Sequence, residues 1–167
     1  MADVKSSGPL LPDDIDLYPA GPELDCILAE RVLGATVGRY KELWSGYENW
    51  IATTPDGAQF YIKLSPHSAY GAAPLWNPST NLSDAQVLVQ HLYAHSDYRA
   101  LTEEVTGENG YSATLQARRP VDNEVTGMRP GDKPQHMETY SVTGTGSTQA
   151  LAVCRAVYKA ACDMGPR

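Results

Sequence analysis

Apolar positions recur along this chain with two different periods, and the longer period predicts three helices. The first helix covers residues 22–33, since proline is favoured at the first helical position and the glycine at 34 is a natural stop. The second begins at Ser83, which with Gln86 fits a capping box, and ends near His95. Its buried face is predicted to carry Ala85, Leu88, Val89 and Leu92.

The third helix follows the Gly-Thr-Gly-Ser sequence of residues 144–147 and has Ser147 or Thr148 as its N-cap. The Gly-Pro pair at 165–166 ends it. Apolar positions repeat at helical spacing in this segment, which predicts a buried face formed by Leu151, Cys154, Val157, Tyr158 and Ala161.

Alternation with a period of two predicts strands between the helices. Residues 49–53 and 58–64 flank a Thr-Pro-Asp-Gly sequence, which is a hairpin signal because proline and glycine fit the backbone angles of a turn. Residues 98–105 and 111–117 form a second strand pair around a glycine-containing turn, and 136–143 is a last candidate strand. In 111–117 apolar and polar residues alternate, as expected where one face is buried and the other is wet.

The remaining segments are interpreted as loops or as an arm. Residues 1–21 combine prolines, glycines and serines without any periodicity, which is typical of a flexible arm. Residues 36–47 and 120–135 are interpreted as loops. Residues 22–167 then form a single α+β domain, in which an antiparallel sheet is packed with about three helices.

Composition and charge exclude several classes of function. The length of 167 residues fits one domain, and 13 basic against 20 acidic residues give a net charge of −7. Because duplex nucleic acid is bound largely by neutralising its phosphates, we do not expect it as the main partner. No apolar run reaches the roughly 18 residues of a membrane span, and no secretion signal is visible, so a cytoplasmic protein without a membrane partner is expected.

Catalytic and metal-binding patterns are weak in this sequence. There is no Gly-x-Ser-x-Gly nucleophile motif, and the glycines of 144–147 are not followed by the lysine of a phosphate-binding loop. His91 and His95 have the spacing of metal ligands but lack the glutamate of a zinc motif. The three cysteines are interpreted as reduced, structural thiols. We therefore expect a non-enzymatic protein without a metal or cofactor.

The loop before the second helix is the strongest candidate site. Residues 75–86 place a tryptophan and small hydrogen-bonding side chains beside a helix N-terminus, a combination that suits a polar or anionic ligand. In the alternative interpretation the loop only starts the helix, its tryptophan covers the core, and the arginines are surface or ion-pair residues. The candidate ligand-binding residues are Trp76, Asn77, Ser79, Thr80, Asn81 and Ser83 in this loop, Trp44, Tyr47 and Tyr70 as further stacking aromatics, and Arg118, Arg119 and Arg155 as charge partners.

Three blocks of the sequence resemble a known family. They are residues 24–34, which end a helix at a glycine, residues 77–85 with their Asn-Pro loop before a helix, and residues 150–156 with the sequence Cys-Arg-Ala. In this order they are similar to the phage ABA-sandwich family, to which the NinX-like proteins of lambdoid phages are related. This chain differs from the family by its long N-terminal arm and its long 120–135 loop. The resemblance implies the fold and a phage origin more directly than an activity.

Phages also encode small non-enzymatic proteins that trap nucleotide signals of bacterial immunity. The resemblance and the candidate loop together therefore favour non-catalytic capture of a small nucleotide-like ligand, such as an immune signal, in the cytoplasm of an infected bacterium. A ligand held between copies would suit a homo-oligomer. The alternative is a protein-interaction module that acts on a host or phage protein through the arm and the 120–135 loop.

Overall fold

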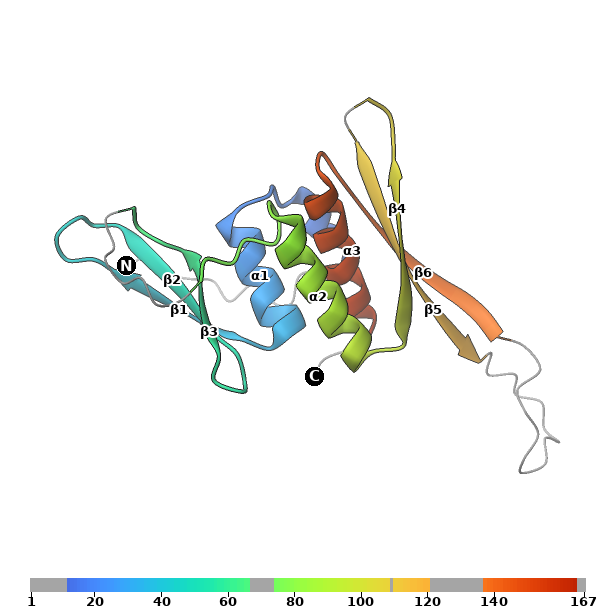
Figure 1. Cartoon of the computed structure of the whole chain (residues 1–167), viewed down its shortest axis with the longest axis horizontal. Coiled ribbons are helices and arrows are strands. Elements are labelled where there is room, and N and C mark those ends of the chain that lie inside the picture. The colour runs from blue at the N-terminus through green and yellow to red at the C-terminus, as the bar shows by residue number, and fades with distance from the viewer. Residues whose placement is uncertain (1–11, 67–73, 109, 121–136, 165–167) are drawn as a thin grey trace.

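The computed structural model describes residues 12–66, 74–108, 110–120 and 137–164 (Figure 1). These residues form an α+β fold, as predicted, and none of their helices is long and apolar enough to cross a bilayer. The helices are the short 3₁₀ helix η1 (Pro12–Leu17), α1 (Pro22–Leu33), α2 (Leu82–His95) and α3 (Gln149–Asp163). The strands are β1 (Thr36–Lys41), β2 (Glu48–Thr53), β3 (Gln59–Lys63), β4 (Tyr98–Val105), β5 (Tyr111–Pro120) and β6 (Met137–Gly146).

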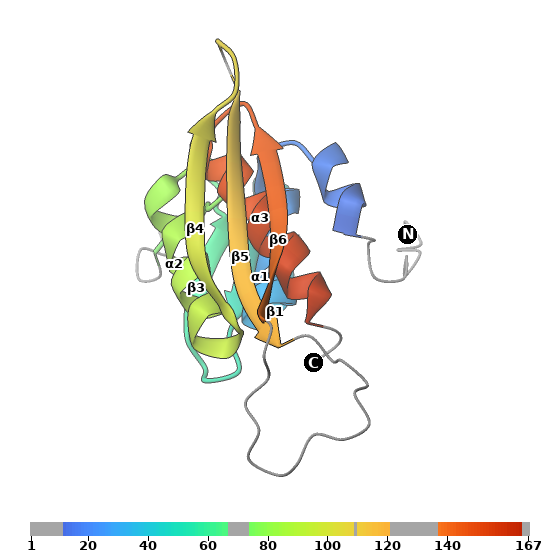
Figure 2. The same cartoon turned by 90° about the vertical axis from the view of Figure 1, so that its right-hand side faces the viewer.

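The α-helices lie between two antiparallel sheets (Figure 1). One sheet has the strand order β1-β2-β3 and the other the order β4-β5-β6, where the sequence alone suggested a single sheet. α1 packs against β1 and β3, while α3 packs against β5 and β6. Figure 2 looks onto the outer face of the second sheet, with the helices behind it. The helix layer therefore has a sheet on each of two sides.

The boundaries of α1 and α2 follow local signals in the sequence. α1 begins at Pro22 and is followed by Gly34, whose left-handed backbone (φ 65°) directs its N–H to the Ala29 carbonyl. The N-cap of α2 is Asn81 rather than the predicted Ser83. Oδ1 of Asn81 accepts the N–H of Ser83 at 2.9 Å, so Ser83 lies inside the first turn and the predicted capping box is replaced. The buried face of α2 is the predicted one, with Ala85, Leu88, Val89 and Leu92.

Glycine makes the contact between α3 and β6. Thr148, one of the two predicted caps, is the N-cap of α3, and its hydroxyl accepts the N–H of Leu151 at 3.2 Å. Gly144 was expected between the last strand and the third helix but lies in β6, where a Cβ would be 2.3 Å from the carbonyl oxygen of Ala152 and the nitrogen of Ala156. The backbones of strand and helix therefore touch at Gly144. The predicted apolar face of α3 is buried throughout.

Two segments differ from their sequence interpretation. Residues 36–47 contain β1, an edge strand without a fully buried residue, and such a strand has no alternating apolar pattern to reveal it. Residues 12–21 are not a free arm, because η1 packs against α3. Ile15 is fully buried, and Asp16 forms a 2.7 Å ion pair with Lys159. The 121–135 part of the predicted long loop, Tyr70 and the Gly-Pro pair at 165–166 lie outside the described residues.

Candidate functional site

The loop before α2 is held by hydrogen bonds within the protein. Ser79 is fully buried; its N–H donates to Oδ1 of Asp25 at 2.8 Å, and its Oγ accepts the N–H of Gly21 at 2.9 Å. Asn77 donates its N–H to Oδ2 of Asp84 at 3.1 Å. The polar groups of this loop therefore join the start of α1 to the start of α2.

Other residues of the loop have a structural use as well. Thr80 donates its hydroxyl to the Asn77 carbonyl at 3.2 Å, and Asn81 caps α2. Trp76 is only 8% exposed, and its ring centroid lies 4.7 Å from that of Phe60. A ring packed in this way has no open face on which a base could stack. The structural interpretation of the loop, with Trp76 covering the core, accounts for these contacts.

Charge in this loop disfavours a bound phosphate. Burial raises the pKa of Asp25 to about 6, although the hydrogen bonds from Ser79 lower it. At neutral pH its carboxylate is therefore mainly ionised. Asp84, half-buried in the first turn of α2, is a second carboxylate beside the same loop. Both carboxylates lie beside the loop residues for which the sequence analysis predicted an anionic ligand.

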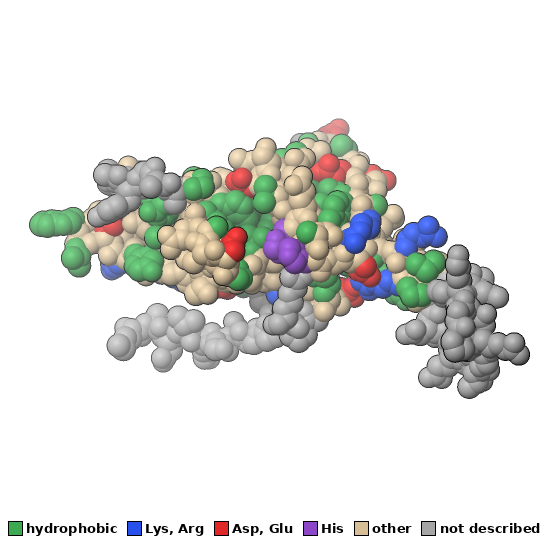
Figure 3. Space-filling model, turned by 60° about the horizontal axis from the view of Figure 1, so that its bottom comes forward, with side chains coloured by type: hydrophobic (Ala, Val, Ile, Leu, Met, Phe, Trp, Pro, Cys, Tyr) green, Lys and Arg blue, Asp and Glu red, His purple; other side chains and the backbone are tan. Residues whose placement is uncertain are grey.

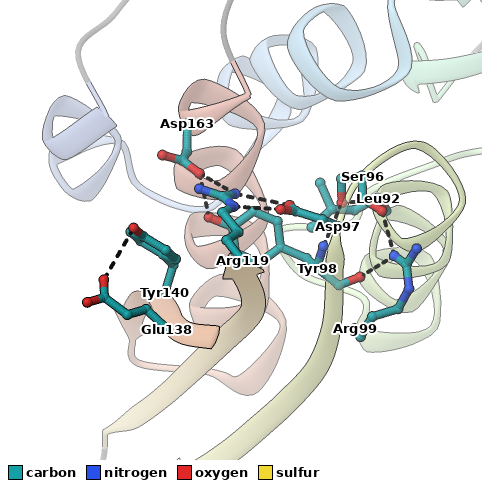
Figure 4. Close-up of polar contacts among 9 residues, drawn as sticks. All are labelled: Leu92, Ser96, Asp97, Tyr98, Arg99, Arg119, Glu138, Tyr140 and Asp163. Atoms are coloured by element: carbon teal, nitrogen blue, oxygen red, sulfur yellow. Dashed lines mark hydrogen bonds and ion pairs between the residues drawn. The ribbon is translucent and has the colours of Figure 1, made fainter. Parts of the chain in front are cut away.

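The Arg119 cluster joins α3 to the three strands of the second sheet near the end of β5 (Figure 4). The Arg119 guanidinium forms ion pairs with Asp97, between α2 and β4, at 2.5 Å and with Asp163, at the end of α3, at 2.7 Å. Its central carbon lies 5.4 Å from the ring centroid of Tyr98 and 5.0 Å from that of Tyr140. Tyr98 donates its hydroxyl to Asp163, and burial together with this bond raises the pKa of Tyr98 to about 12. Tyr98 therefore stays protonated, and the cluster fastens β5 to the helices.

The other two predicted arginines form contacts with other elements or lie on the surface. The Arg155 guanidinium donates to the carbonyl oxygens of Thr145 at 2.6 Å and Tyr18 at 2.9 Å, which ties the residue after η1 to β6 and α3. Arg118 is exposed on β5. Because this strand and the β1–β2 turn with Trp44 lie on opposite sides of the helices, the described residues of the predicted site do not all converge on one pocket (Figure 1).

The turn between β1 and β2 exposes large apolar side chains. Leu43 is 98% and Trp44 100% exposed, and Tyr40 and Tyr47 beside them are also exposed. We call residues 40–47 the hairpin tip. It lies at the end of the first sheet farthest from the second sheet (Figure 1). Hydrophobic side chains protrude at this end of the molecule (Figure 3).

The hairpin tip is nevertheless well ordered by its own hydrogen bonds. The N–H of Glu42 donates to the Tyr47 carbonyl at 2.8 Å, and the N–H of Gly46, which has a left-handed backbone (φ 72°), donates to the Glu42 carbonyl at 3.0 Å. The Glu42 carboxylate accepts the Ser45 hydroxyl at 2.6 Å and the side-chain amide of the buried Asn49 at 3.0 Å. The fold therefore holds Leu43 and Trp44 out in solvent on a fixed turn.

A cavity of about 680 Å³ lies where the three α-helices end beside the β2–β3 turn. Its walls include apolar side chains of all three helices, together with Glu30, Arg31, Asp56, His91 and His95. The two histidine rings, which the sequence had paired by spacing, stack with their centroids 4.2 Å apart. Figure 3 shows histidine next to hydrophobic surface on this face. In the part of the chain that the structure describes, no group of three or more His, Cys, Asp or Glu side chains could hold a metal ion.

Sequence reasoning identified Trp44 and Tyr47 as candidate binding residues but missed Leu43 and the cavity. A Leu-Trp pair directly after Lys41 and Glu42 in a predicted loop is the signal that could have found the tip. The cavity has no local signal, since it depends on the convergence of three separate helix ends.

Comparison with protein-family models, with curated proteins and with solved structures found no match to this chain. The resemblance to the phage family rests on the three sequence blocks alone and stays a prediction.

Proposed function

We propose that this chain is a non-catalytic binding protein that inserts its hairpin tip into an apolar pocket of a protein partner. The observation that carries the proposal is the exposure of Leu43 and Trp44 on a turn of fixed conformation. Single apolar side chains are common on protein surfaces. Two adjacent, almost fully exposed ones on an ordered tip are better explained as a docking element.

Two physical properties favour the tip for binding. Tryptophan is enriched among the residues that dominate interface energies, and burying a leucine such as Leu43 contributes about 1.5–3 kcal/mol. The turn is already ordered, so docking loses little conformational entropy. The tip determines what the partner must offer. We expect an apolar pocket, a hydrogen-bond acceptor for the indole N–H of Trp44, and an acidic group for the exposed Lys41. On the phage resemblance, this partner is a protein of the phage or of the infected bacterium.

Photo-crosslinking from the tip tests this proposal. A photoreactive phenylalanine analogue replaces Trp44 in one sample and Val105 in the control, because Val105 is an exposed apolar residue on the second sheet. We expect a protein to be crosslinked from position 44 and not from position 105. With the purified partner, Trp44→Ala should weaken binding by about 30-fold or more, or about 2 kcal/mol, and Val105→Ala by less than about twofold. Equal crosslinking, or an affinity unchanged by Trp44→Ala, would refute the proposal.

Capture of a nucleotide-like ligand is the second candidate, and exposed aromatics at the same tip favour it. Trp44 and Tyr47 are two of the predicted stacking residues, and stacking of a base on an aromatic ring contributes about 1–3 kcal/mol. With Arg118 and Arg119 on the second sheet, the phosphates would need the cations of β1, Arg39 and Lys41. A thermal-shift screen with cyclic dinucleotides, NAD and simple nucleotides tests this candidate. A stabilisation that Trp44→Ala abolishes supports it, and a panel without any shift removes it.

A further inference from the structure

We infer that the cavity at the helix ends binds an organic ammonium ligand, meaning an amine cation attached to an apolar body. This inference does not depend on the hairpin tip, which lies elsewhere on the molecule. It rests on the size of the cavity, on its apolar walls and on the charges around it.

The cavity has the dimensions and walls of a small-molecule site. Its volume of about 680 Å³ falls within the roughly 300–1,000 Å³ that is usual for such sites. Each of the three α-helices contributes apolar surface, and the β2–β3 turn adds Pro55 and Ala58 on one side. Burying an apolar body against these walls removes hydrocarbon surface from water, which favours binding. The apolar side chains from the helices are Val32, Leu33, Leu92, Ala161 and, directly after α3, Met164.

The polar groups around the cavity favour a cation over an anion. α1, α2 and α3 all end beside the cavity, and a helix C-terminus carries roughly half a negative charge, which the Arg99 guanidinium offsets at α2 but not at α1 and α3. Glu30 and Asp56 add two carboxylates. The Thr54 hydroxyl and the Ala58 N–H lower the pKa of Asp56, so it is ionised at neutral pH. Among the described residues of the lining, Arg31 is the single lysine or arginine. A phosphate or carboxylate would therefore meet more negative than positive charge.

On the α2 side of the cavity, part of the helix-end charge is already offset. Arg99 donates to the carbonyl oxygens of Tyr93 at 2.9 Å and Ser96 at 2.5 Å. Nδ1 of His95 lies 2.9 Å from the His91 carbonyl oxygen, and because a carbonyl oxygen only accepts, we assign a proton to Nδ1. The negative charge around the cavity therefore comes chiefly from Glu30, Asp56 and the ends of α1 and α3.

Three probes with one apolar body separate charge from apolar burial: phenylbutylamine, phenylbutanol and phenylbutyrate. Each is titrated into the full chain at neutral pH and followed by amide NMR. We expect the amine to shift the signals of the lining residues and to bind about tenfold more tightly than phenylbutyrate. Tighter or equal binding of phenylbutyrate would overturn the inference. So would shifts that lie away from the cavity, or an absence of binding by all three probes.

Charge variants on the cavity rim supply the second test. Glu30 and Asp56 are exposed, so Glu30→Gln with Asp56→Asn should leave the fold intact, which thermal unfolding verifies. This double variant should lose about fivefold to tenfold in amine affinity and keep its affinity for phenylbutanol. Glu23→Gln, in the first turn of the same α1, is the matched control and should change neither affinity. An amine affinity that the double variant leaves unchanged would refute the charge argument. Trp44→Ala should not affect the amine, which separates this site from the hairpin tip.

Discussion

The backbone N–H of Ser79 donates a 2.8 Å hydrogen bond to the buried carboxylate of Asp25, 54 positions earlier in the chain. The bond fastens the loop before α2 to the first turn of α1. Its acceptor is shielded from water, and burial raises the pKa of Asp25 to about 6. The burial of this acceptor, rather than the bond itself, thereby makes the stability of the fold depend on pH.

Asp25→Asn should remove this part of the pH dependence. Between the ordinary pKa of 3.8 and about 6, the folded state binds a proton that the unfolded state has released. Asp25 therefore stabilises the fold in acid, and this contribution is lost as the pH rises through about 6. The loss is on the order of 2–3 kcal/mol. Urea unfolding across this pH range should show the wild type losing stability relative to the variant as the pH rises. Parallel pH profiles would contradict the assignment.

Trp76→Ala should destabilise the fold rather than disturb a binding surface. The ring is buried against Phe60, and removing a buried tryptophan costs about 3–5 kcal/mol in lost apolar contact and in the cavity left behind. Trp44→Ala is the control, since that ring is fully exposed and its loss should change stability by less than about 0.5 kcal/mol. Free energies of unfolding from urea titration compare the two. If Trp76→Ala lowers the free energy of unfolding as little as Trp44→Ala does, the packing of the Trp76 ring contributes little to stability.

Local patterns predicted those elements whose signals lie within a few residues. The bounds of α1 follow from Pro22 and Gly34, and β4 covers the predicted residues 98–105. The buried face of α2 follows from the spacing of its apolar residues. By contrast, β1 has no buried residue and therefore no alternating pattern, and Ile15 enters the core from a segment full of helix breakers.

The role of the loop before α2 was harder to predict, because it depends on contacts between distant parts of the chain. Small polar residues before a helix can receive a ligand or fasten the helix, and their sequence is the same in both cases. In this protein Asp25 in α1 accepts the N–H of Ser79, so the loop fastens the helices to each other. The exposure of Trp44 likewise follows from the hydrogen bonds of Glu42 across the turn and not from any local apolar pattern.

Gly144→Ala should separate β6 from α3. A Cβ at this position would lie 2.3 Å from backbone atoms of Ala152 and Ala156, which cannot rotate away as a side chain could. Forcing an atom into such a contact costs about 1–3 kcal/mol or more, because strand and helix must move apart. Ser141→Ala, at an exposed position on the same strand, should stay within about 0.5 kcal/mol of the wild type. A thermally stable Gly144→Ala protein would mean that the two elements are less tightly opposed than the structure has them.

Arg119→Gln should weaken the fold in a way that salt reduces, and its neighbour Arg118 supplies the control. Arg119 contacts two carboxylates, of Asp97 and Asp163, whereas Arg118 is exposed on β5. Exposed ion pairs contribute at most about 1 kcal/mol each, so we expect a loss of about 1–2 kcal/mol for Arg119→Gln and less than about 0.5 kcal/mol for Arg118→Gln.

The dependence of this loss on salt and pH distinguishes charge from packing. At about 1 M salt the screening length falls to roughly 3 Å, so the difference between Arg119→Gln and the wild type should shrink. Arg119 also lowers the pKa of Asp97, chiefly through its hydrogen bond. That contribution is present at neutral pH and is lost as the pH falls through the lowered pKa of the folded state. Urea unfolding in low and high salt, at neutral and acid pH, measures both effects. If the loss is the same under all four conditions, Arg119 acts through its stacking on Tyr98 and Tyr140 and not through its ion pairs.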